Sequence, residues 1–476
     1  MLVHGVAPEG LTKIMLHPIP KDRRSSSRNS DNYRGIALSS IIGKLFDWAI
    51  LIENEERLCT SDLQFGFKPD TSTTQCTGVL LECVNYYTSR DTNVNLLFLD
   101  ATKAFDRVEY VKLFKLLVRR GISPIVIRLL LNMYTRQKVS VVWNNTITEP
   151  FECKNGVKQG GVLSPILFGI YIDEMLIKLK NSGLGCHIGH VFMGALAYAD
   201  DLVLMAPTMY GLKKLLEISH DFAKEYNIIF NPKKSKWMSY ALNDSGASVY
   251  LDGKPVDHVD HFVHLGCLIG PNSFRKSLER HINKFYSEVN LLMAQFGKAF
   301  ASSRHKLFKS YCMSCYGSQL WDFSSNEVDK FFVAWRKAIR FLWKLPRKTH
   351  CSLLPLISCD PPIEFQLHRR FFKYIHKVIN SDNSVVKMYG KLILEGSRSS
   401  TGKSFNFLLR KYGVNRDSLL DCECTALAVI KPITHSPEIV ASATTVRELC
   451  EIRDQRFTGI LQPEEVVELI NAICIG

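Results

Sequence analysis

Aspartates at the ends of apolar runs constrain the fold of this chain more than any other feature. Val94 to Leu99 is a short apolar run that reads as a buried strand and stops at Asp100. One hundred residues further on, Asp200 and Asp201 interrupt a second apolar stretch, Ala195 to Met205, which has the pattern of a hairpin. Adjacent carboxylates are costly to bury unless they bind cations or protons, although a plain turn would also account for two acids at a hairpin tip. We therefore expect strands that hold carboxylates rigidly enough to bind divalent cations.

The rest of the sequence predicts a mixed α/β unit followed by a helical region. Apolar spacings of three and four indicate helices at 36–58, 73–87, 110–119, 124–134, 162–180 and 212–226. Short apolar or alternating runs indicate strands at 138–143, 147–153 and 236–240, with a further hairpin near residue 253. After residue 270, helices are expected at 277–299, 306–316, 328–343 and 364–379, with a closing helix at 464–473. A basic, serine-rich stretch at 21–32 reads as an exposed loop.

The charge balance favours a polyanionic partner. The chain has 60 Lys and Arg against 46 Asp and Glu, which gives a net charge of +14. Nucleic acid and an acidic membrane surface would both attract such a chain, and an ordinary solvated basic surface is the alternative. No apolar run approaches the roughly 18 residues of a membrane span, so we expect no membrane partner.

The 14 cysteines are expected to be free thiols rather than disulfides or zinc ligands. The first ten residues lack the apolar core of a secretory signal, which indicates an intracellular protein of the nucleus or cytoplasm and not a secreted one. Cys312 and Cys315 have the spacing of a zinc pair, but no second pair with suitable spacing accompanies them. Cys422 and Cys424 are likewise unpaired.

Five segments resemble, in order and spacing, the motifs of reverse transcriptases. They are Phe98–Asp106 (FLDATKAFD), Gly156–Pro165 (GVKQGGVLSP), Tyr198–Asp201 (YADD), Asn231–Ser235 (NPKKS) and His264–Gly266 (HLG). The chain is most similar to the polymerases of non-LTR retrotransposons, and the resemblance covers residues 32–345. It includes Asn32–Ile36 (NYRGI), Gln64–Phe67 (QFGF) and Tyr316–Trp321 (YGSQLW). The sequence departs from the family at His264, where an aromatic residue is usual, and at Gly35, where proline is common.

The resemblance implies an RNA-directed DNA polymerase that extends a primer on an RNA template from deoxynucleoside triphosphates. Its fold would be α/β (α+β), a right-hand polymerase with an antiparallel palm sheet and a helical thumb. The expected divisions are partial fingers at 1–91, a palm with inserted fingers elements at 92–270, a thumb at 271–345 and a helical extension at 346–476. The implied partners are RNA template, DNA primer and RNA–DNA hybrid, while the sequence carries no signature of an oligomeric state.

Two classes of function stay open at this point. The first is an active polymerase, and the alternative is a catalytically inactive or repurposed polymerase fragment that only binds RNA or RNA–DNA hybrid. Intact Asp100, Asp200 and Asp201 favour the enzyme, whereas the chain's opening within the fingers region favours the fragment. No endonuclease or RNase H pattern is visible, so we expect a piece of a longer element protein.

The resemblance assigns the catalytic centre to Asp100, Asp200 and Asp201 as carboxylate ligands of metal ions. With the backbone carbonyl of Ala101 they would hold two Mg²⁺ ions, with Mn²⁺ as an alternative. One cation would activate the primer hydroxyl, and the other would steady the departing pyrophosphate. Taken alone, Asp100 would also suit a helix N-cap. Lys234 would protonate or neutralise the pyrophosphate, with a solvated surface lysine as the alternative.

The nucleotide pocket is also assigned by the resemblance. Phe105 would lie beneath the incoming sugar and exclude a 2′-hydroxyl, so DNA is the expected product; a core phenylalanine is the alternative. Gln159 and Gly160 would line the nucleotide and template pocket, because glycine lets the backbone approach a ligand closely. The other expected substrate-binding residues are Tyr198 in the hairpin and, for the triphosphate, Arg34 and Lys21.

Nucleic-acid contacts are expected in the region that follows the palm. The segment His264-Leu265-Gly266 resembles the primer-grip turn of the family. Lys276, Arg280 and Lys284 recur every four residues beside the apolar face of the helix expected at 277–299. This basic stripe would follow a duplex backbone, and a merely solvated helix face is the alternative.

Overall fold

The structure is a computed structural model that describes residues 5–22, 25–240, 248–416, 443–448 and 450–451. Contact clustering separates two compact units: unit 1 contains residues up to 260 together with 383–385, and unit 2 contains 261–382 and the residues from 386 onward. The closing helix expected at 464–473 and the pair Cys422 and Cys424 lie outside the described residues. No described helix is both long enough and apolar enough to cross a membrane. The division into fingers, palm, thumb and extension stays a prediction.

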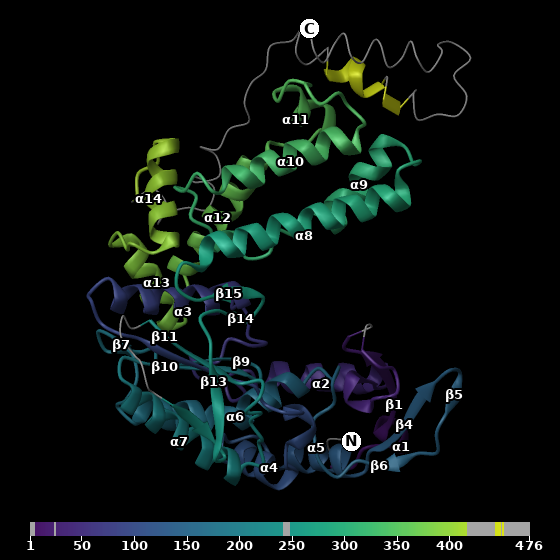
Figure 1. Cartoon of the computed structure of the whole chain (residues 1–476). Helices are drawn as coiled ribbons and strands as arrows, with labels where there is room; N and C mark the ends of the chain where they lie inside the picture. The colour runs from purple at the N-terminus through teal and green to yellow at the C-terminus, as the bar shows by residue number, and fades with distance from the viewer. Residues whose placement is uncertain (1–4, 23–24, 241–247, 417–442, 449, 452–476) are drawn as a thin grey trace. The chain divides into compact units, whose positions relative to one another are not determined.

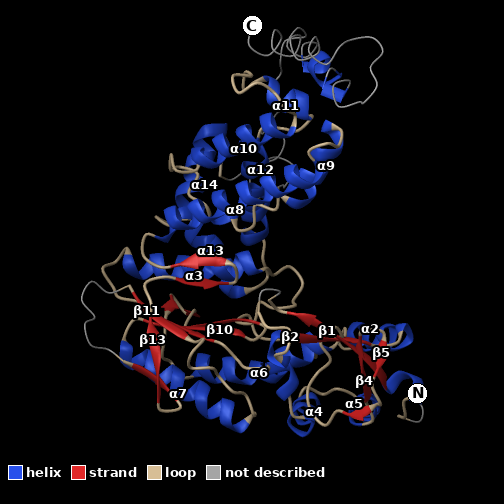
Figure 2. Cartoon of the chain, turned by 45° about the vertical axis from the view of Figure 1, so that its right-hand side comes forward, coloured by secondary structure: helices blue, strands red, loops and turns tan. Residues whose placement is uncertain are grey.

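A six-stranded sheet forms the centre of unit 1 (Figures 1 and 2). Its strands lie in the order β12 (Val249–Leu251), β13 (Lys254–His258), β11 (Lys236–Ser239), β3 (Asn95–Leu99), β10 (Asp201–Ala206) and β9 (Ala195–Tyr198). All five residues of β3 are buried, as predicted for the apolar run at 94–99. Strand β10 pairs antiparallel with β3 on one side and with β9 on the other, which confirms the predicted hairpin.

Helices cover both faces of this sheet. α6 (Ser164–Asn181) and α7 (Met209–Glu225) lie on one face, and α3 (Thr73–Thr88) lies on the other (Figure 1). Ser72 and Thr208 start α3 and α7, because each hydroxyl accepts a hydrogen bond from a backbone N–H in the first turn. The other helices of unit 1 are α1 (Glu9–Thr12), α2 (Ile41–Glu53), α4 (Tyr110–Arg119) and α5 (Pro124–Thr135).

A second sheet of unit 1 carries the N-terminal strand. Its path runs β2 (Tyr33–Leu38), β1 (Lys13–Pro20), β4 (Lys138–Trp143) and β5 (Thr146–Ile147), and β6 (Phe151–Glu152) also pairs with β4. Strands β4 and β5 are joined at Asn144 and Asn145, which both take the positive φ that such tight turns require. A short pair, β7 (His187–Ile188) and β8 (Val191–Phe192), completes the named strands of unit 1.

Helix α2 departs from the sequence expectation. Residues up to Leu38 belong to β2, and the helix expected at 36–58 begins only after Ser40, whose hydroxyl accepts from the Gly43 N–H. The apolar residues whose spacing predicted this helix face solvent, with Leu45 64% exposed and Ile52 70% exposed. The helical period is therefore confirmed, but the apolar face that it creates is uncovered among the described residues.

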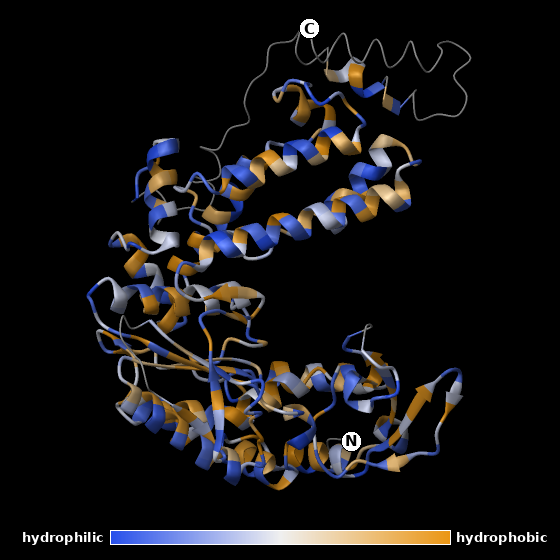
Figure 3. Cartoon of the chain, in the orientation of Figure 1, coloured by the Kyte–Doolittle hydropathy of each residue, from blue (hydrophilic) through white to orange (hydrophobic). Residues whose placement is uncertain are grey.

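Unit 2 is a small hairpin followed by helices, and hydrophilic and hydrophobic residues alternate along those helices (Figure 3). Strands β14 (Phe262–His264) and β15 (Cys267–Ile269) form the hairpin. The helices are α8 (Ser273–Phe296), α9 (Ala301–Tyr311), α10 (Asp329–Leu342), α11 (Leu353–Ser358), α12 (Ile363–Ile379), α13 (Ser384–Leu394) and α14 (Ser400–Tyr412). Phe285 of α8 packs against Phe308 of α9 and Phe331 of α10, so these three helices share one core. α11, α13 and α14 lie within the helical extension predicted for residues 346–476, although their individual bounds were not predicted.

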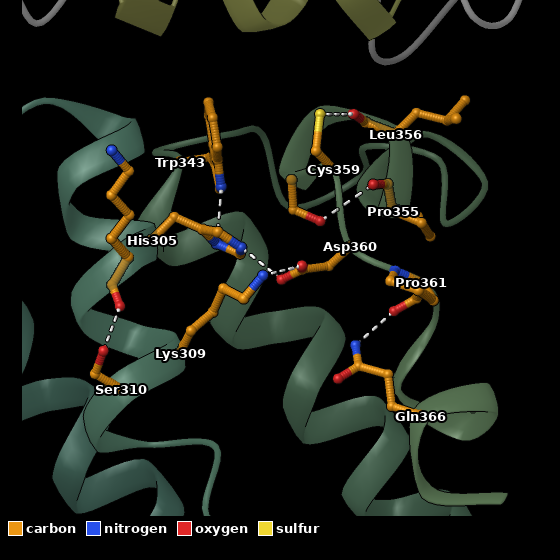
Figure 4. Close-up of polar contacts among 12 residues, drawn as sticks. His305, Lys309, Ser310, Trp343, Pro355, Leu356, Cys359, Asp360, Pro361 and Gln366 are labelled. Carbon is orange, nitrogen blue, oxygen red and sulfur yellow. Dashed lines mark hydrogen bonds and ion pairs between the residues drawn. The ribbon is translucent and has the colours of Figure 1, made fainter. Parts of the chain in front are cut away.

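A polar network that includes the buried His305 and Asp360 links α9 to the segment after α11 (Figure 4). His305 Nε2 lies 2.7 Å from Asp360 Oδ2, and Lys309 Nζ lies 2.5 Å from Asp360 Oδ1. Trp343 Nε1 donates to His305 Nδ1 at 3.5 Å, which leaves the His305 proton on Nε2, where it is donated to Asp360. Bonds from His305 and Lys309 hold the pKa of Asp360 below its usual value, despite the opposing effect of burial.

Replacing Asp360 with asparagine is expected to destabilise unit 2. A carboxylate with a lowered pKa contributes stability that is present above its unfolded pKa and is lost as the pH falls through its folded pKa. Asp360→Asn should therefore lower the free energy of unfolding by about 2 kcal/mol at pH 7, because two bonds to a charged group are weakened. The deficit should shrink as the pH falls below 4. Thermal unfolding across this range, beside the exposed control Asp382→Asn, tests the expectation; a pH-independent deficit would contradict it.

Candidate active site

Neighbouring strands of the central sheet bring two of the predicted carboxylates together. Leu99 at the end of β3 pairs with Leu202 of β10, so Asp100 and Asp201 occupy the next position on adjacent strands. Asp201 also pairs with Tyr198 of β9, which leaves Ala199 and Asp200 as the two turn residues between β9 and β10. The buried strands fix the register, because a slip by one residue would turn the apolar side chains out of the core.

Burial and mutual repulsion dominate the electrostatics of this cluster. Desolvation, followed by the charges of Asp200 and Asp100, raises the pKa of Asp201 from 3.8 to about 6. Desolvation also raises the pKa of Asp200, where the Asp100 charge adds to the effect and the Arg34 guanidinium opposes it. A cation that binds between these carboxylates would offset the repulsion that raises the pKa values of Asp200 and Asp201.

The predicted Lys234 lies beside Asp100. Lys234 Nζ is 3.7 Å from Asp100 Oδ2, an atom that is buried and accepts no hydrogen bond. The Asn231 N–H donates to the Asp100 carbonyl at 2.8 Å, and the Asp100 N–H donates to Ser235 Oγ at 3.2 Å. Asn231 Oδ1 accepts from the Lys234 N–H at 3.4 Å. The Asn231–Ser235 turn therefore ties the position of this lysine to the end of β3.

The aromatic ring of Phe105 stacks on a second, buried ring. It lies in the short 3₁₀ helix Ala104–Arg107 after β3, and its ring stacks on that of Phe168 with centroids 4.4 Å apart. The Val157 N–H donates to the Phe105 carbonyl at 2.9 Å, which joins the segment after β3 to the segment before α6. Phe105 is partly exposed, whereas Phe168 is buried, so part of the Phe105 side chain remains accessible.

Gln159 and Gly160 lie against the second sheet. The Ala37 N–H donates to the Gln159 carbonyl at 2.7 Å, and Gln159 Nε2 lies 3.4 Å from Asp106 Oδ1. Gly160 has φ +107°, and a Cβ at this position would lie 3.0 Å from the Ala37 carbonyl oxygen. Glycine is therefore required here both by the backbone conformation and by the approach of β2.

The residues predicted to bind the nucleotide, Arg34, Lys21 and Tyr198, differ in their surroundings. Arg34 is exposed on β2, and its charge partly offsets the rise in the pKa of Asp200 that burial causes. Lys21 Nζ donates to the Asp31 carbonyl at 2.9 Å, and the Lys21 charge acts on Asp31 and Asp106. Tyr198 is half-buried, with its ring 6.5 Å from that of Phe67. The Arg34 charge therefore acts on Asp200, whereas Lys21 is hydrogen-bonded within its own loop.

The predicted primer-grip segment forms the turn of the β14–β15 hairpin in unit 2. Leu265 and Gly266 both take positive φ values, +47° and +76°. Tyr316 Oη donates to the Leu265 carbonyl at 2.7 Å, and the Tyr316 ring covers Gly266, where a Cβ would lie 2.9 Å away. His264 is buried, and desolvation lowers its pKa to about 4, so its side chain is neutral. Only the Leu265–Gly266 turn of this segment is exposed enough to meet a ligand.

The predicted basic stripe lies on the exposed side of α8. Lys276, Arg280 and Lys284 are exposed, whereas Leu278 and Phe285 on the same helix are buried. Lys284 lies 3.7 Å from Glu288, so this lysine is partly neutralised within the helix. The amphipathic pattern expected for residues 277–299 is thereby confirmed.

The oxygen donors around Asp100 have the chemistry of a Mg²⁺ site. Among the described residues, no three His, Cys, Asp or Glu side chains converge closely enough to hold a metal ion by themselves. Oxygen donors at this end of the sheet are the carboxylates of Asp100 and Asp201 and the nearby backbone of Ala101. The Ala101 backbone is fixed by an isolated β-bridge with Phe230. Oxygen ligands of this kind suit Mg²⁺, which retains several waters in its coordination shell. The raised pKa of Asp201 and the absence of a hydrogen bond to Asp100 Oδ2 from the described residues fit a bound cation.

Sequence reasoning missed several residues that shape this site. Gln64 is 1% exposed and bonds the Ala199 backbone, although the segment QFGF was noted only as a point of resemblance. Asp106 lies beside Gln159, and burial raises its pKa. Asn231 and Ser235 hold the Lys234 turn. One signal was available in the sequence: Gln64 is a polar residue within an otherwise apolar segment, and such residues are buried only with hydrogen-bond partners.

Comparisons with known proteins agree with the motifs. The family model described as reverse transcriptase (RNA-dependent DNA polymerase) matches residues 19–296. A Pol polyprotein from the type-1 retrotransposable element R2 of Popillia japonica is 28% identical over 264 residues, which is 55% of this chain and 37% of that protein. The RNA-directed DNA polymerase from the mobile element jockey of Drosophila funebris is 23% identical over 404 residues, which is 79% of this chain and 42% of that protein. This chain therefore spans less than half the length of these relatives.

Among solved structures, apo telomerase from Candida tropicalis aligns over 90% of this chain and 71% of its own, at 12% identity and a TM-score of 0.43. The family match, by contrast, covers more than half of the 476 residues. It includes the strands that carry Asp100, Asp200 and Asp201, together with Phe105, Gln159 and Lys234. This chain belongs to the reverse transcriptase (RNA-dependent DNA polymerase) family, and its curated relatives are proteins of non-LTR retrotransposons.

Proposed function

We propose that this chain adds deoxynucleotides to a primer 3′ end on an RNA template. The observation that carries the proposal is the placement of Asp100 and Asp201 at matching ends of adjacent buried strands, with Asp200 in the turn between β9 and β10. The family match supports the assignment. Nucleotidyl transfer requires carboxylates on a rigid frame, and a buried antiparallel sheet provides one.

The cluster would hold two Mg²⁺ ions, or Mn²⁺, through Asp100, Asp200, Asp201 and the Ala101 carbonyl. The bound ions would supply activation of the primer hydroxyl and neutralisation of the pyrophosphate. Lys234, whose Nζ lies 3.7 Å from Asp100 Oδ2, is placed to donate a proton to the leaving group or to neutralise its charge. The Arg34 charge, which already acts on Asp200, would bind the triphosphate.

The nucleotide would lie over the Phe105 ring. That ring is backed by Phe168, so it cannot move away from a bulkier sugar, and a 2′-hydroxyl would be excluded. Gln159 and Gly160 would border the base and template, because their backbone is fixed against Ala37. Tyr198 would contribute to the same pocket from β9, and Lys21 would assist with the triphosphate.

RNA template, DNA primer and their hybrid are the proposed macromolecular partners. The exposed stripe Lys276, Arg280 and Lys284 on α8 would follow the duplex backbone, and the turn at Leu265–Gly266, next to the buried His264, would contact the primer. The described cysteines are free thiols, which supports the proposal that the protein works inside the cell, in the nucleus or the cytoplasm.

Template-directed incorporation tests the proposed function. Purified chain would be given a DNA primer on an RNA template, Mg²⁺ and one deoxynucleotide at a time. The expected result is extension only with the nucleotide complementary to the next template base. Extension without template, or equal use of all four nucleotides, would contradict the proposal. Hybrid binding without extension would instead identify a binding protein.

Magnesium is expected to stabilise the protein in a pH-dependent way. The folded pKa of Asp201, about 6, lies above its ordinary value of 3.8, so protonation favours the fold below pH 4 and this contribution is lost as the pH rises through 6. Bound Mg²⁺ offsets the repulsion of the ionised acids. Mg²⁺ should therefore raise the melting temperature by a few degrees at pH 7.5 and hardly at pH 5. Equal shifts at both pH values, or an equal shift in Asp201→Asn, would contradict this expectation.

A further inference from the structure

A short segment outside the sheet runs beside the hairpin that carries the acids. The Phe65 N–H donates to the Ala197 carbonyl at 2.8 Å, and the Ala197 N–H donates to the Leu63 carbonyl at 2.9 Å. This pairing places Gln64 next to the turn between β9 and β10. The approach is close, since a Cβ at Gly66 would lie 2.4 Å from the Ala199 backbone nitrogen.

The Gln64 side chain bonds both backbone groups of Ala199. Gln64 Oε1 accepts from the Ala199 N–H at 2.9 Å and from the Gly66 N–H at 2.8 Å. Gln64 Nε2 donates to the Ala199 carbonyl at 3.4 Å. Because Gln64 is 1% exposed, water cannot replace these bonds without opening the segment.

The residue that Gln64 holds is conformationally strained. Ala199 has φ +57° at the first central position of a two-residue hairpin, where glycine is preferred. A left-handed alanine costs about 1 kcal/mol, so the turn needs support from its surroundings. The next residue in the chain is Asp200, and Asp201 follows it. The position of both acids therefore depends on how firmly this turn is held.

We propose that Gln64 is a positioning residue that fixes the turn presenting Asp200 and Asp201. It touches neither substrate nor metal and acts only through the Ala199 backbone. Its consequence for catalysis rests on the proposed polymerase function, but the bonds themselves can be tested without any activity. If the turn were loose, the two carboxylates would bind metal more weakly, because each binding event would cost the conformational entropy of ordering the turn.

Two substitutions separate the hydrogen bonds from the shape of the side chain. Gln64→Met keeps the length of the side chain and removes all three bonds, whereas Gln64→Glu keeps an oxygen that accepts from both N–H groups. Gln137→Met is the matched control, because Gln137 is also buried in unit 1 and is not bonded to the turn. Hydrogen exchange would be followed by mass spectrometry in peptides containing Gly66 and Ala199, in full-length protein without metal. The Mg²⁺ concentration for half-maximal extension would be measured beside it.

Gln64→Met should speed exchange in both peptides at least tenfold and raise the half-maximal Mg²⁺ concentration severalfold, and it should lower the melting temperature because two buried N–H groups lose their acceptor. Gln64→Glu should restore most of the exchange protection, and Gln137→Met should change neither quantity. Unchanged exchange in Gln64→Met, or equal exchange in Gln64→Met and Gln137→Met, would overturn the proposal. If the parent chain extends no primer, the exchange result still decides the role of Gln64, and only the proposed function fails.

A second and independent observation concerns the distribution of charge. Residues 301–416 contain 21 Lys and Arg and only seven Asp and Glu, a surplus of 14. The whole chain also has a net charge of +14. The rest of the chain therefore has no net charge, because it contains 39 Lys and Arg and 39 Asp and Glu. On an ordinary solvated surface, positive and negative side chains are interspersed, whereas side chains of one sign repel one another. The surplus is therefore a local property of the helices of unit 2.

The basic side chains project from three linked helices. Tyr374 of α12 bonds Tyr389 of α13, which in turn bonds Thr401 of α14, through buried hydroxyl groups. On the outside of these helices, exposed cations come from α12, α13 and α14. Among them are Arg369, Lys377, Lys387, Lys403 and Arg410. We call these three hydrogen-bonded helices, with their exposed cations, the basic helices.

We infer that the basic helices bind a nucleic-acid backbone, at a place separate from the α8 stripe. A lipid surface would require large apolar side chains beside the cations. None of the large apolar side chains of α12, α13 and α14 is exposed. On α12, for example, Leu367, Phe371 and Ile375 are buried. Cations without apolar neighbours match phosphates, where each contact releases a counterion.

Salt-dependent RNA binding tests this inference on the full chain. One variant carries glutamine at Arg369, Lys377, Lys387, Lys403 and Arg410. The matched control carries glutamine at five exposed cations of α4, α6 and α7 in unit 1, which removes the same charge: Lys115, Arg119, Lys180, Lys213 and Lys224. The probe is a labelled single-stranded RNA, with phosphatidylserine vesicles as a second probe.

The first variant should bind RNA at least tenfold more weakly at 150 mM salt, with a shallower dependence of log K on log salt. Each lost phosphate contact lowers that slope by about 0.7 for a single strand. The control should keep the parent slope. Equal losses in the two variants, or loss of vesicle binding without loss of RNA binding, would overturn the inference. The outcome is independent of polymerase activity.

Discussion

Asp201→Asn is expected to reduce the rate of single-nucleotide incorporation about a thousandfold. Removing one of the carboxylates that hold the metal ions forfeits about 4 kcal/mol of transition-state stabilisation. The loss should fall on the rate constant for incorporation rather than on the affinity for primer–template, because Asp201, the first residue of β10, would act through the metal ions and not by direct contact with the duplex. Asparagine retains the volume of the side chain, so the register of β10 against β3 is preserved.

The stability of the same variant distinguishes this account from simple unfolding. Burial and the charges of Asp200 and Asp100 raise the pKa of Asp201 to about 6, so the ionised side chain opposes folding at pH 7.5. Asp201→Asn removes that repulsion and should melt at the same temperature as the parent or higher. A variant that loses activity together with its melting temperature would contradict the assignment of Asp201 as a metal ligand.

Phe105→Val is expected to admit ribonucleotides. The Phe105 ring is fixed by stacking on Phe168 at 4.4 Å, so it cannot yield to a 2′-hydroxyl. A smaller side chain leaves room for that group, and discrimination between deoxy and ribo substrates should fall about a hundredfold. The ratio of kcat/KM for the two nucleotides on one template measures the effect.

The control for this prediction is Phe151→Val, since Phe151 is exposed on β6 and should leave the ratio unchanged. Phe105→Val also weakens the stack on Phe168, and a modest loss of stability is expected. Discrimination that stays at the parent level in a folded Phe105→Val protein would place the ring outside the sugar pocket. It would then support the alternative of a core phenylalanine.

The elements around the site were predictable because strong local patterns specify them. An apolar run that stops at Asp100, and an apolar hairpin interrupted at Asp200, identify two strands from the sequence alone, and burial then fixes their register. The helices α4, α5 and α10 follow from apolar spacing. Motif order supplied the roles of Phe105, Gln159 and Lys234, which the structure places in unit 1 with the acids.

What the sequence did not predict depends on contacts between distant segments. Gln64 lies 135 positions from Ala199, and nothing in its own segment indicates which backbone it will bond. The exposed apolar face of α2 has the pattern of a buried one, since periodicity reports only that one face is apolar. A helical extension was expected around α14, but its bounds were not predicted, because Lys403, Arg410 and Lys411 dilute its apolar pattern.

Primer extension on an RNA template tests the central claim most directly. The parent chain would be compared with a protein carrying both Asp200→Ala and Asp201→Ala, in Mg²⁺ and deoxynucleotides and at equal occupancy of primer–template. We expect extension by the parent and none by the double variant, with hybrid binding unchanged. Equal extension by both proteins would show that the acids at the end of β10 are not the catalytic centre. Binding without extension by either would leave a polymerase fold that acts only by holding nucleic acid.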